Sequence, residues 1–210
     1  MIYNIISTGS KGNATVIDKV ILIDCGVPFK ALLQYYRDIQ LVLLTHIHGD
    51  HFNKATIRKL AFERPTLRFG CCEWLVTDLL KCGVKKEQID VYAPGYCFIY
   101  PKFTIMPERL LHNVSNCGYH VWIANNALFY ATDTNSLNGI EAPNYDLYMI
   151  EANYSEPEIL ERIKEKESQG IHCYEYDVLK NHLSLEKCND WLYRNLGDKS
   201  EYIYMHQHEN

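Results

Sequence analysis

Short apolar runs alternate with polar turns along most of this 210-residue chain. Runs of this kind, bounded by glycine, proline, asparagine or aspartate, are typical of buried β-strands. We therefore expect many short strands, at residues 2–6, 14–17, 20–24, 40–44, 66–69, 89–92, 96–100, 103–106, 109–111, 118–124, 127–132, 146–151 and 201–205.

Helical stretches separate several of these strands. The pattern indicates helices at residues 28–37, 53–63, 72–82 and 157–167, and a last helix that begins at Leu183 or Ser184 and ends near Leu196. Asn53 and Ser184 can each cap a helix N-terminus, and Gly83 can end the helix that precedes it. Because strands and helices alternate without a linker, one mixed α/β domain over residues 1–210 is expected.

Composition narrows the class of protein. The apolar fraction of 47% is ordinary for a globular protein. The start of the chain lacks the basic and apolar segments of a secretory signal, and no apolar run approaches the roughly 20 residues of a membrane span. The eight cysteines form no C-x-x-C pair, which favours reduced thiols. These features predict a cytoplasmic protein that has no membrane partner.

Charge is distributed unevenly. Residues 1–117 carry 14 basic and 10 acidic side chains, whereas residues 118–210 carry 7 and 16. A basic face is typical of nucleic-acid-binding proteins. Such a face could equally be an ordinary solvated helix surface. Its candidate residues are Lys54, Arg58, Lys59, Arg64 and Arg68, followed by Lys81, Lys85 and Lys86.

The segment 45–51, Thr-His-Ile-His-Gly-Asp-His, directly follows the apolar strand at 40–44. His46 and His48 are two residues apart, so on an extended backbone they point the same way. Asp50 and His51 lie where the chain turns toward the next helix. Imidazole and carboxylate are common ligands of zinc and related metals, so this loop predicts a metal site with two pairs of ligands.

Other candidate ligands follow later strands. Each of these residues comes just after, or at the end of, an expected strand: His46, His112, Asp133, Glu151 and His206. Strand ends in a layered sheet share an edge, and active sites gather there. The pattern therefore predicts that these side chains contribute to one site.

The order of these residues resembles the metallo-β-lactamase superfamily of binuclear metallohydrolases. The motif His46-x-His48-x-Asp50-His51 is followed by His112, then Thr132-Asp133, then a late histidine, over nearly the whole chain. The resemblance implies a four-layered αβ/βα sandwich, with two mixed β-sheets flanked by helices.

The resemblance also implies a ligand set for two divalent metal ions, zinc or manganese (Zn2+ or Mn2+). His46, His48 and His112 would bind the first ion, Asp50, His51 and His206 the second, and Asp133 would bridge both. Two cations roughly 3.5–4 Å apart can hold a bridging water whose pKa falls to near neutrality, and that hydroxide would be the nucleophile.

Three further motifs look like the YycJ/WalJ-type nucleases within this superfamily. They are the turn Gly9-Ser10-Lys11-Gly12-Asn13, the acidic motif Glu151-Ala152-Asn153-Tyr154 and the motif His182-Leu183-Ser184. By this resemblance Ser10, Asn13 and His182 would contact substrate. His182 would bind phosphate or protonate the leaving group, Glu151 would orient His182, and Asp50 is also counted as catalytic.

Two positions depart from the family pattern. The residue after the third histidine is often aspartate in relatives but is Asn113 here, which could weaken the support of a metal ligand. At the C-terminus either His206 or His208 could be the last ligand, and His206 is preferred because it directly ends a strand. His120 and His172 are expected to lie outside the site.

The leading functional prediction is a metal-dependent phosphodiesterase, specifically a DNA exonuclease. Hydrolysis of small cyclic nucleotides is an alternative, because the same chemistry serves a smaller substrate. A glyoxalase II-like thioesterase is another, although it would not need the Glu151 and His182 pair. DNA is favoured over RNA, and the sequence leaves the cleavage polarity, the native metal and the oligomeric state open.

Overall fold

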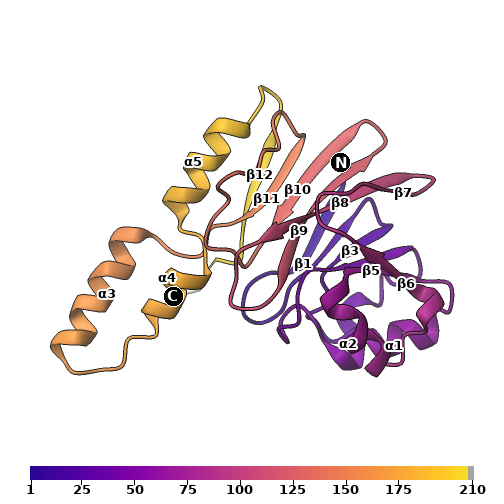
Figure 1. Ribbon diagram of the computed structural model, residues 1–210, viewed down its shortest axis with the longest axis horizontal. Coiled ribbons are helices and arrows are strands. Elements are labelled where there is room, and N and C mark those ends of the chain that lie inside the picture. The colour runs from indigo at the N-terminus through magenta and orange to yellow at the C-terminus, as the bar shows by residue number, and fades with distance from the viewer. Residues whose placement is uncertain (208–210) are drawn as a thin grey trace. The chain divides into compact units, whose positions relative to one another are not determined.

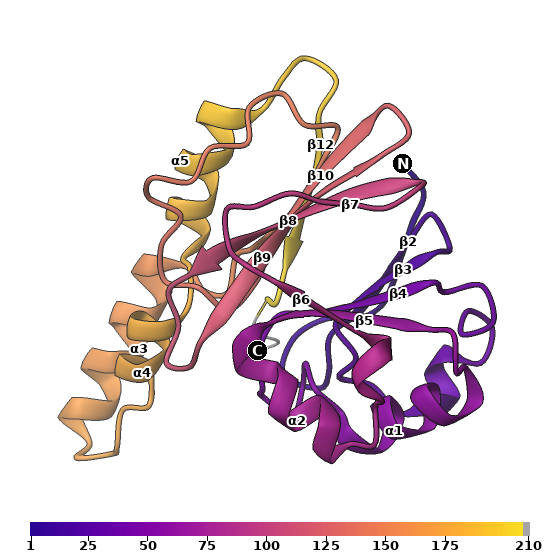
Figure 2. The same cartoon turned by 45° about the vertical axis from the view of Figure 1, so that its right-hand side comes forward.

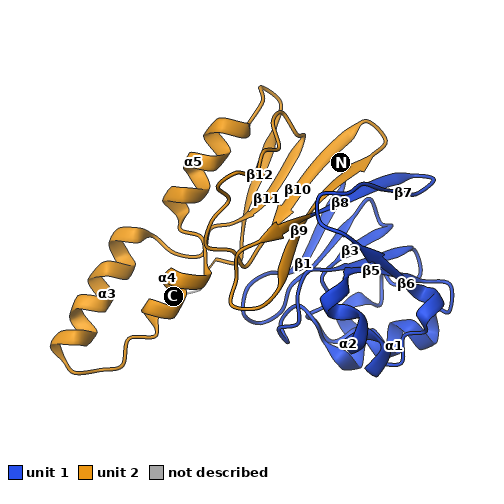
Figure 3. Cartoon of the chain, viewed as in Figure 1, with its two compact units in different colours: residues 1–107 blue, residues 108–210 orange. Residues whose placement is uncertain are grey.

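The computed structural model describes residues 1–207, and the chain divides into two compact units, Met1–Pro107 and Glu108–Asn210 (Figure 3). The alternative last ligand, His208, lies outside the described residues. Within residues 1–207, twelve strands form two six-stranded sheets, and both sheets are mixed. This arrangement confirms the expected fold class of two mixed sheets with helices. Each unit is described by itself below.

The first sheet follows chain order, β1-β2-β3-β4-β5-β6. Its strands are β1 (Tyr3–Ser7), β2 (Ala14–Ile17), β3 (Ile21–Ile23), β4 (Leu41–Leu44), β5 (Arg68–Cys72) and β6 (Ile89–Tyr92). The first three strands are antiparallel, and β3 to β6 are parallel. All four residues of β4 are completely buried, which explains its unbroken apolar sequence.

Helices α1 (Lys54–Glu63) and α2 (Val76–Lys81) cover one face of this sheet (Figure 2). Three short 3₁₀ helices accompany them, η1 (Phe29–Leu32), η2 (Glu73–Leu75) and η3 (Lys86–Gln88). Asn53 caps α1 as expected, because its side chain accepts a hydrogen bond from the Thr56 amide at 3.1 Å. Ile57 and Leu60 of α1 lie in the core with Val42 and Leu44 of β4.

The second sheet has the order β12-β11-β10-β9-β8-β7. Its strands are β7 (Phe98–Ile99), β8 (Phe103–Leu110), β9 (Asn116–Ile123), β10 (Asn126–Ala131), β11 (Leu147–Glu151) and β12 (Glu201–Met205), and the boundary between the units falls within β8. Strands β10, β11 and β12 are parallel to one another. Their carboxyl ends therefore meet at one edge.

The described residues of the second unit contain three helices, which Figure 1 labels. Helix α5 (Leu185–Asn195) buries Trp191 and Leu192 among residues of β10 and β11, and Ser184 caps it by accepting a hydrogen bond from the Lys187 amide at 3.1 Å. Helices α3 (Glu156–Ser168) and α4 (Glu175–Asn181) pack against each other around a small core of their own, with Ile159 and Ile163 at its centre.

Several expected elements differ from the structure. The expected helix at 28–37 is only the η1 turn and further turns, because its backbone forms hydrogen bonds such as Ala31 N to Pro28 O and Leu33 stays 57% exposed. The expected strands at 103–106 and 109–111 are one strand, since Pro107 is accommodated within β8. Helix α4 was not expected at all.

Smaller boundary shifts have local causes. The strand expected at 96–100 is only β7, because Tyr96 belongs to a turn whose amide donates to Ala93 O. The hairpin between β9 and β10 turns at Ala124, which has a left-handed backbone with φ of 52°, so Asn126 already pairs in the ladder. All eight cysteines are free thiols. Among the described residues no helix combines the length and apolarity that a membrane crossing requires.

Candidate metal centre

The histidine loop, residues 45–51, begins where β4 ends in the first unit. The buried carboxylate of Asp24 accepts hydrogen bonds from the Thr45 amide at 3.0 Å and from the Thr45 hydroxyl at 2.9 Å. The carbonyl of His48 then accepts the amides of His51 and Phe52, which turns the chain into α1. The loop is therefore held by strand β4 at one end and by a capped helix at the other.

The four donors of the histidine loop are arranged as two pairs. His46 Nε2 lies 3.1 Å from His48 Nδ1, and their rings meet edge to face. His51 Nε2 lies 3.7 Å from the Asp50 carboxylate. The rings of His46 and His51 are 4.2 Å apart between centroids. Nitrogen and oxygen donors at such distances suit zinc or a related cation, so the loop fits the metal that its sequence predicts.

The sequence alone did not identify Asp24 as a residue that supports the histidine loop. It is completely buried, and its backbone is left-handed with φ of 59°. Its Oδ2 lies 2.7 Å from His51 Nδ1, so Nδ1 carries the proton and Nε2 carries the lone pair that a metal would use. The available signal was a charged residue at the end of an apolar strand.

Ser10 and Asn13, both expected to contact substrate, have different surroundings. Ser10 is exposed, whereas Asn13 is completely buried. The Asn13 amide nitrogen lies 2.8 Å from His51 Nε2 and 3.1 Å from Gly9 O, and its oxygen accepts from the Gly9 amide at 2.9 Å. These contacts place Asn13 against a candidate metal ligand inside the first unit.

In the second unit polar side chains lie close together at the ends of β10, β11 and β12. We call these side chains the strand-end cluster, which consists of His112, Asp133, Glu151, His182 and His206. Asp133, Glu151, His182 and His206 each offer a ligand atom within 4.8 Å of the others. The Asn116 side chain donates to the carbonyls of Thr132 and Asp133 at 3.0 and 2.7 Å, which holds this edge in place.

Glu151 and His182 form a close pair inside the cluster. His182 Nδ1 lies 2.6 Å from Glu151 Oε1, and the side chain of His182 is 20% exposed. The other oxygen of Glu151 accepts from the amides of Thr134 at 2.8 Å and Leu183 at 3.3 Å. Because Nδ1 of His182 donates a hydrogen bond to Glu151, Nε2 is the nitrogen that can interact with another partner.

His112 receives its support from a backbone carbonyl. Its Nδ1 donates to Asn181 O at 3.0 Å, and its Nε2 lies 3.9 Å from Asp133 Oδ1. This contact fixes the tautomer with the lone pair on Nε2, as a metal ligand needs. Asn113, where relatives often have aspartate, is exposed. The carbonyl that orients His112 belongs to α4, which explains why the sequence gave no hint of it.

The pKa of His206 indicates whether the strand-end cluster favours a positive charge. Burial lowers the pKa of His206, but the carboxylates of Asp133, at 3.2 Å, and Glu151, at 3.4 Å, raise it overall to about 10. The cluster thus retains a positive charge even on a buried imidazole. Two buried carboxylates beside imidazole nitrogens are a donor set that a divalent metal ion fits.

The remaining histidines play other parts. His120 is buried against Phe129, with ring centroids 4.5 Å apart, and its Nδ1 lies 3.1 Å from the Tyr145 hydroxyl. His172 is exposed in the segment that joins α3 to α4. Both therefore lie outside the strand-end cluster, as expected.

Comparison with solved structures shows the fold. The chain is similar to the metallo-beta-lactamase fold protein YhfI from Bacillus subtilis, with a TM-score of 0.74, 16% identity and coverage of 98% of this chain and 85% of that one. It is similar to the short form of human tRNase Z, with a TM-score of 0.73, 15% identity and coverage of 100% and 93%. The Zn(2+)-bound PqqB of Methylobacterium extorquens matches at 0.66, with 13% identity and coverage of 99% and 89%.

Family membership rests on sequence. No curated protein sequence shows significant similarity to the chain. A model of the family described as "Beta-lactamase superfamily domain" matches residues 19–188, a span that contains every candidate ligand except His206. The two clusters have the histidine and aspartate donors of a metal-binding hydrolase. The chain belongs to the metallo-β-lactamase superfamily.

Proposed function

We propose that this protein is a binuclear metal-dependent phosphodiesterase that degrades DNA as an exonuclease. The histidine loop and the strand-end cluster would supply the ligands together. His46, His48 and His112 would hold the first ion and Asp50, His51 and His206 the second, with Asp133 shared by both. Two bound cations would lower the pKa of a water molecule and stabilise negative charge on phosphate oxygens.

The pair of Glu151 and His182 is the observation that carries the proposal. Glu151 holds Nδ1 of His182 at 2.6 Å, and Thr134 and Leu183 hold Glu151 in turn. His182 is thereby oriented with Nε2 directed away from the carboxylate. Protonated at Nε2, His182 would bind a phosphate oxygen and give its proton to the leaving oxygen, while the buried carboxylate stabilises the imidazolium.

Two likenesses support nucleic acid as the substrate class. The motifs around Asn13, Glu151 and His182 resemble those of the YycJ/WalJ-type nucleases. One solved structure of the same fold is a tRNase Z, whose name refers to an RNA substrate. A basic excess in the first 117 residues also favours a polyanion as partner.

The second candidate is a phosphodiesterase for small cyclic nucleotides. The acidic balance of residues 118–210 favours it, because an acidic surface repels a long polyanion more than a single nucleotide. A glyoxalase II-like thioesterase is supported less well, because thioester hydrolysis needs no proton donor of the kind that Glu151 and His182 provide.

A substrate panel tests the proposal. The full chain, loaded with zinc or manganese, is incubated with single-stranded DNA, double-stranded DNA, RNA, cyclic mononucleotides and a thioester, and metal content is measured on the same samples. We expect shortening of DNA strands from an end. Failure to cleave any polymer, with two metal ions bound per chain, would exclude the nuclease. Cleavage of cyclic nucleotides alone would establish the second candidate.

A further inference from the structure

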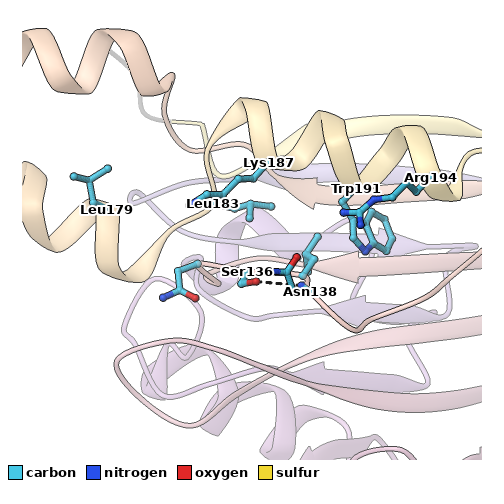
Figure 4. Close-up of a pocket in the computed structure, with 9 residues that line it drawn as sticks. Ser136, Asn138, Leu179, Leu183, Lys187, Trp191 and Arg194 are labelled. Atoms are coloured by element: carbon cyan, nitrogen blue, oxygen red, sulfur yellow. Dashed lines mark hydrogen bonds between the residues drawn. The ribbon is translucent and has the colours of Figure 1, made fainter.

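A groove runs along α5 in the second unit, and its inner end is lined by Leu183, the residue after His182. Its inner part has a volume of about 290 Å³ and is lined by the segment after β10 and by one side of α5 (Figure 4). An outer part of about 320 Å³ shares Leu137, Trp191 and Arg194 with the inner part. The two parts therefore form one continuous groove.

Chain connectivity ties the inner end of the groove to the candidate catalytic residues. Leu183 lines the groove, directly follows His182 and donates its amide to Glu151. On the opposite wall Asn135 comes two residues after Asp133, and its side chain donates to Lys180 O at 2.6 Å. Both walls at the inner end of the groove are therefore within two residues, along the chain, of a candidate catalytic or metal-binding residue.

The α5 wall carries two cations on one side of the helix. Lys187, Trp191 and Arg194 follow one another at spacings of four and three residues, so they share a face. Lys187 and Arg194 are seven residues, or two turns, apart, which separates them by about 10 Å along the axis. Both side chains are exposed. This separation lets the two side chains contact different phosphates of one extended strand.

The facing wall offers neutral hydrogen-bonding groups. Asn135, Ser136 and Asn138 line it, and the Ser136 hydroxyl accepts the Asn138 amide at 3.1 Å. The floor is Trp191, which is only 2% exposed and donates its indole N–H to Ile140 O at 2.9 Å. Because this indole is covered, it presents no face on which a base could stack.

We infer that the groove binds the sugar-phosphate backbone of a single nucleic-acid strand, with Lys187 and Arg194 each neutralising a phosphate. This inference rests on the proposed function and deepens it by naming the surface that would bind the polymer. Helix α5 is about 16 Å long, whereas a cyclic mononucleotide would occupy only the end near His182. Backbone contacts without base stacking imply little sequence preference.

Charge limits the length of the binding path. Glu141 lines the outer part of the groove together with Arg194 and repels phosphate there. The attraction is therefore concentrated between Lys187 and Arg194. A strand long enough to contact both cations should gain most of the available affinity, and longer strands should gain little more.

The test measures binding separately from cleavage. Fluorescence anisotropy of a labelled ten-nucleotide single strand is recorded with the full chain in the zinc-loaded His182→Ala background, which slows hydrolysis. Adding Lys187→Ala with Arg194→Ala should weaken binding about tenfold or more. It should also reduce the slope of log K against log salt by about 0.7 for each cation removed. Lys187→Arg should retain the affinity.

Matched controls use two exposed lysines of the same unit that do not line the groove, Lys164→Ala with Lys199→Ala. They should change the affinity less than twofold. Three results would each contradict strand binding by the groove. They are equal weakening by both double variants, an unchanged affinity in the groove variant, and no binding of the strand by the parent. Hydrolysis of bis(p-nitrophenyl) phosphate by the wild-type chain separates the two proposals. Strand binding without any phosphodiester hydrolysis would support the groove as a binding site and would exclude the proposed function.

Discussion

The histidine loop and the strand-end cluster bring potential metal ligands together in two different ways. The loop places four donors within six consecutive residues, immediately after one buried strand. The cluster gathers its donors from the ends of four strands and from the segment between α4 and α5. A loop of this kind can be recognised as a motif, whereas a cluster exists only once the sheet has formed its register.

The two regions also differ in how their histidines are oriented. In the loop, the buried carboxylate of Asp24 holds Nδ1 of His51. In the cluster, a carbonyl of α4 holds His112 and the Glu151 carboxylate holds His182. Each of these imidazoles thus has its Nδ1 held by an oxygen atom of the protein, which places the lone pair on Nε2. What differs is the distance along the chain between ligand and support.

The largest expected effect comes from Asp133→Ala in the cluster. If Asp133 is shared by both ions, its removal should lower the metal content of the chain and reduce activity by more than about 10³-fold, because a shared carboxylate balances charge between two cations. Metal analysis and a phosphodiesterase assay measure both effects. Asp198→Ala, at an exposed position, serves as the control. Full metal content with normal turnover would remove Asp133 from the centre.

His182→Ala should separate chemistry from metal binding. We expect turnover of phosphodiesters to fall about 10²-fold or more, the usual contribution of a general acid, while metal content stays near that of the wild type. His172→Ala changes an exposed histidine of the same unit and should have no effect on either quantity. A parallel loss of metal would instead identify His182 as a ligand.

Asp24→Asn should weaken metal binding by the histidine loop, although Asp24 is not itself a proposed ligand. Asp24 accepts hydrogen bonds with both of its oxygens, and an asparagine has only one acceptor oxygen. Loss of such support typically costs 10–100-fold in metal affinity, so zinc affinity measured against a competing chelator should fall within that range. The exposed Asp38→Asn provides the control. An unchanged affinity would mean that the loop orients His51 without Asp24.

The sequence revealed ligands more readily than it revealed their supports. The donors of the loop are contiguous, and Asp133, Glu151 and His206 could be found because each follows an apolar run of recognisable length. The supporting role of Asp24 could not be predicted, because its partner His51 is 27 residues away and their contact depends on β3 lying beside β4. The support of His112 is even harder to predict, because it is a main-chain carbonyl, which any residue type provides.

The same physical limit explains the errors in the fold. The buried strand β4 was predicted with its carboxyl end correct because its apolar run is unbroken and turn residues follow it. The segment 28–37 has apolar and aromatic residues at helical spacing, but only Leu32 among η1 residues is buried, so little packing stabilises an α-helix there. Helix α4 is short and contains mixed residues, and it is fixed mainly by its packing on α3.

Two glycines near the histidine loop sharpen the contrast between local and distant determinants. A Cβ on Gly26 would lie 1.6 Å from Asp50 O and 2.8 Å from the Asn13 amide nitrogen, and both are backbone atoms. The backbone at Gly26 must therefore approach the loop more closely than any side chain allows. A Cβ on Gly49, inside the loop itself, would meet no atom within 4 Å.

Gly26→Ala should therefore lower the free energy of unfolding by about 3 kcal/mol, the upper end of the usual cost of overpacking, because the backbone of Asp50 or Asn13 has to move. Gly49→Ala should change it by less than about 0.5 kcal/mol. Chemical denaturation of the metal-free chain measures both without interference from ligand binding. Equal effects at the two positions would show that the loop is free to shift. A large effect at Gly26 alone would show that Asp50 is positioned by a segment 24 residues earlier in the chain.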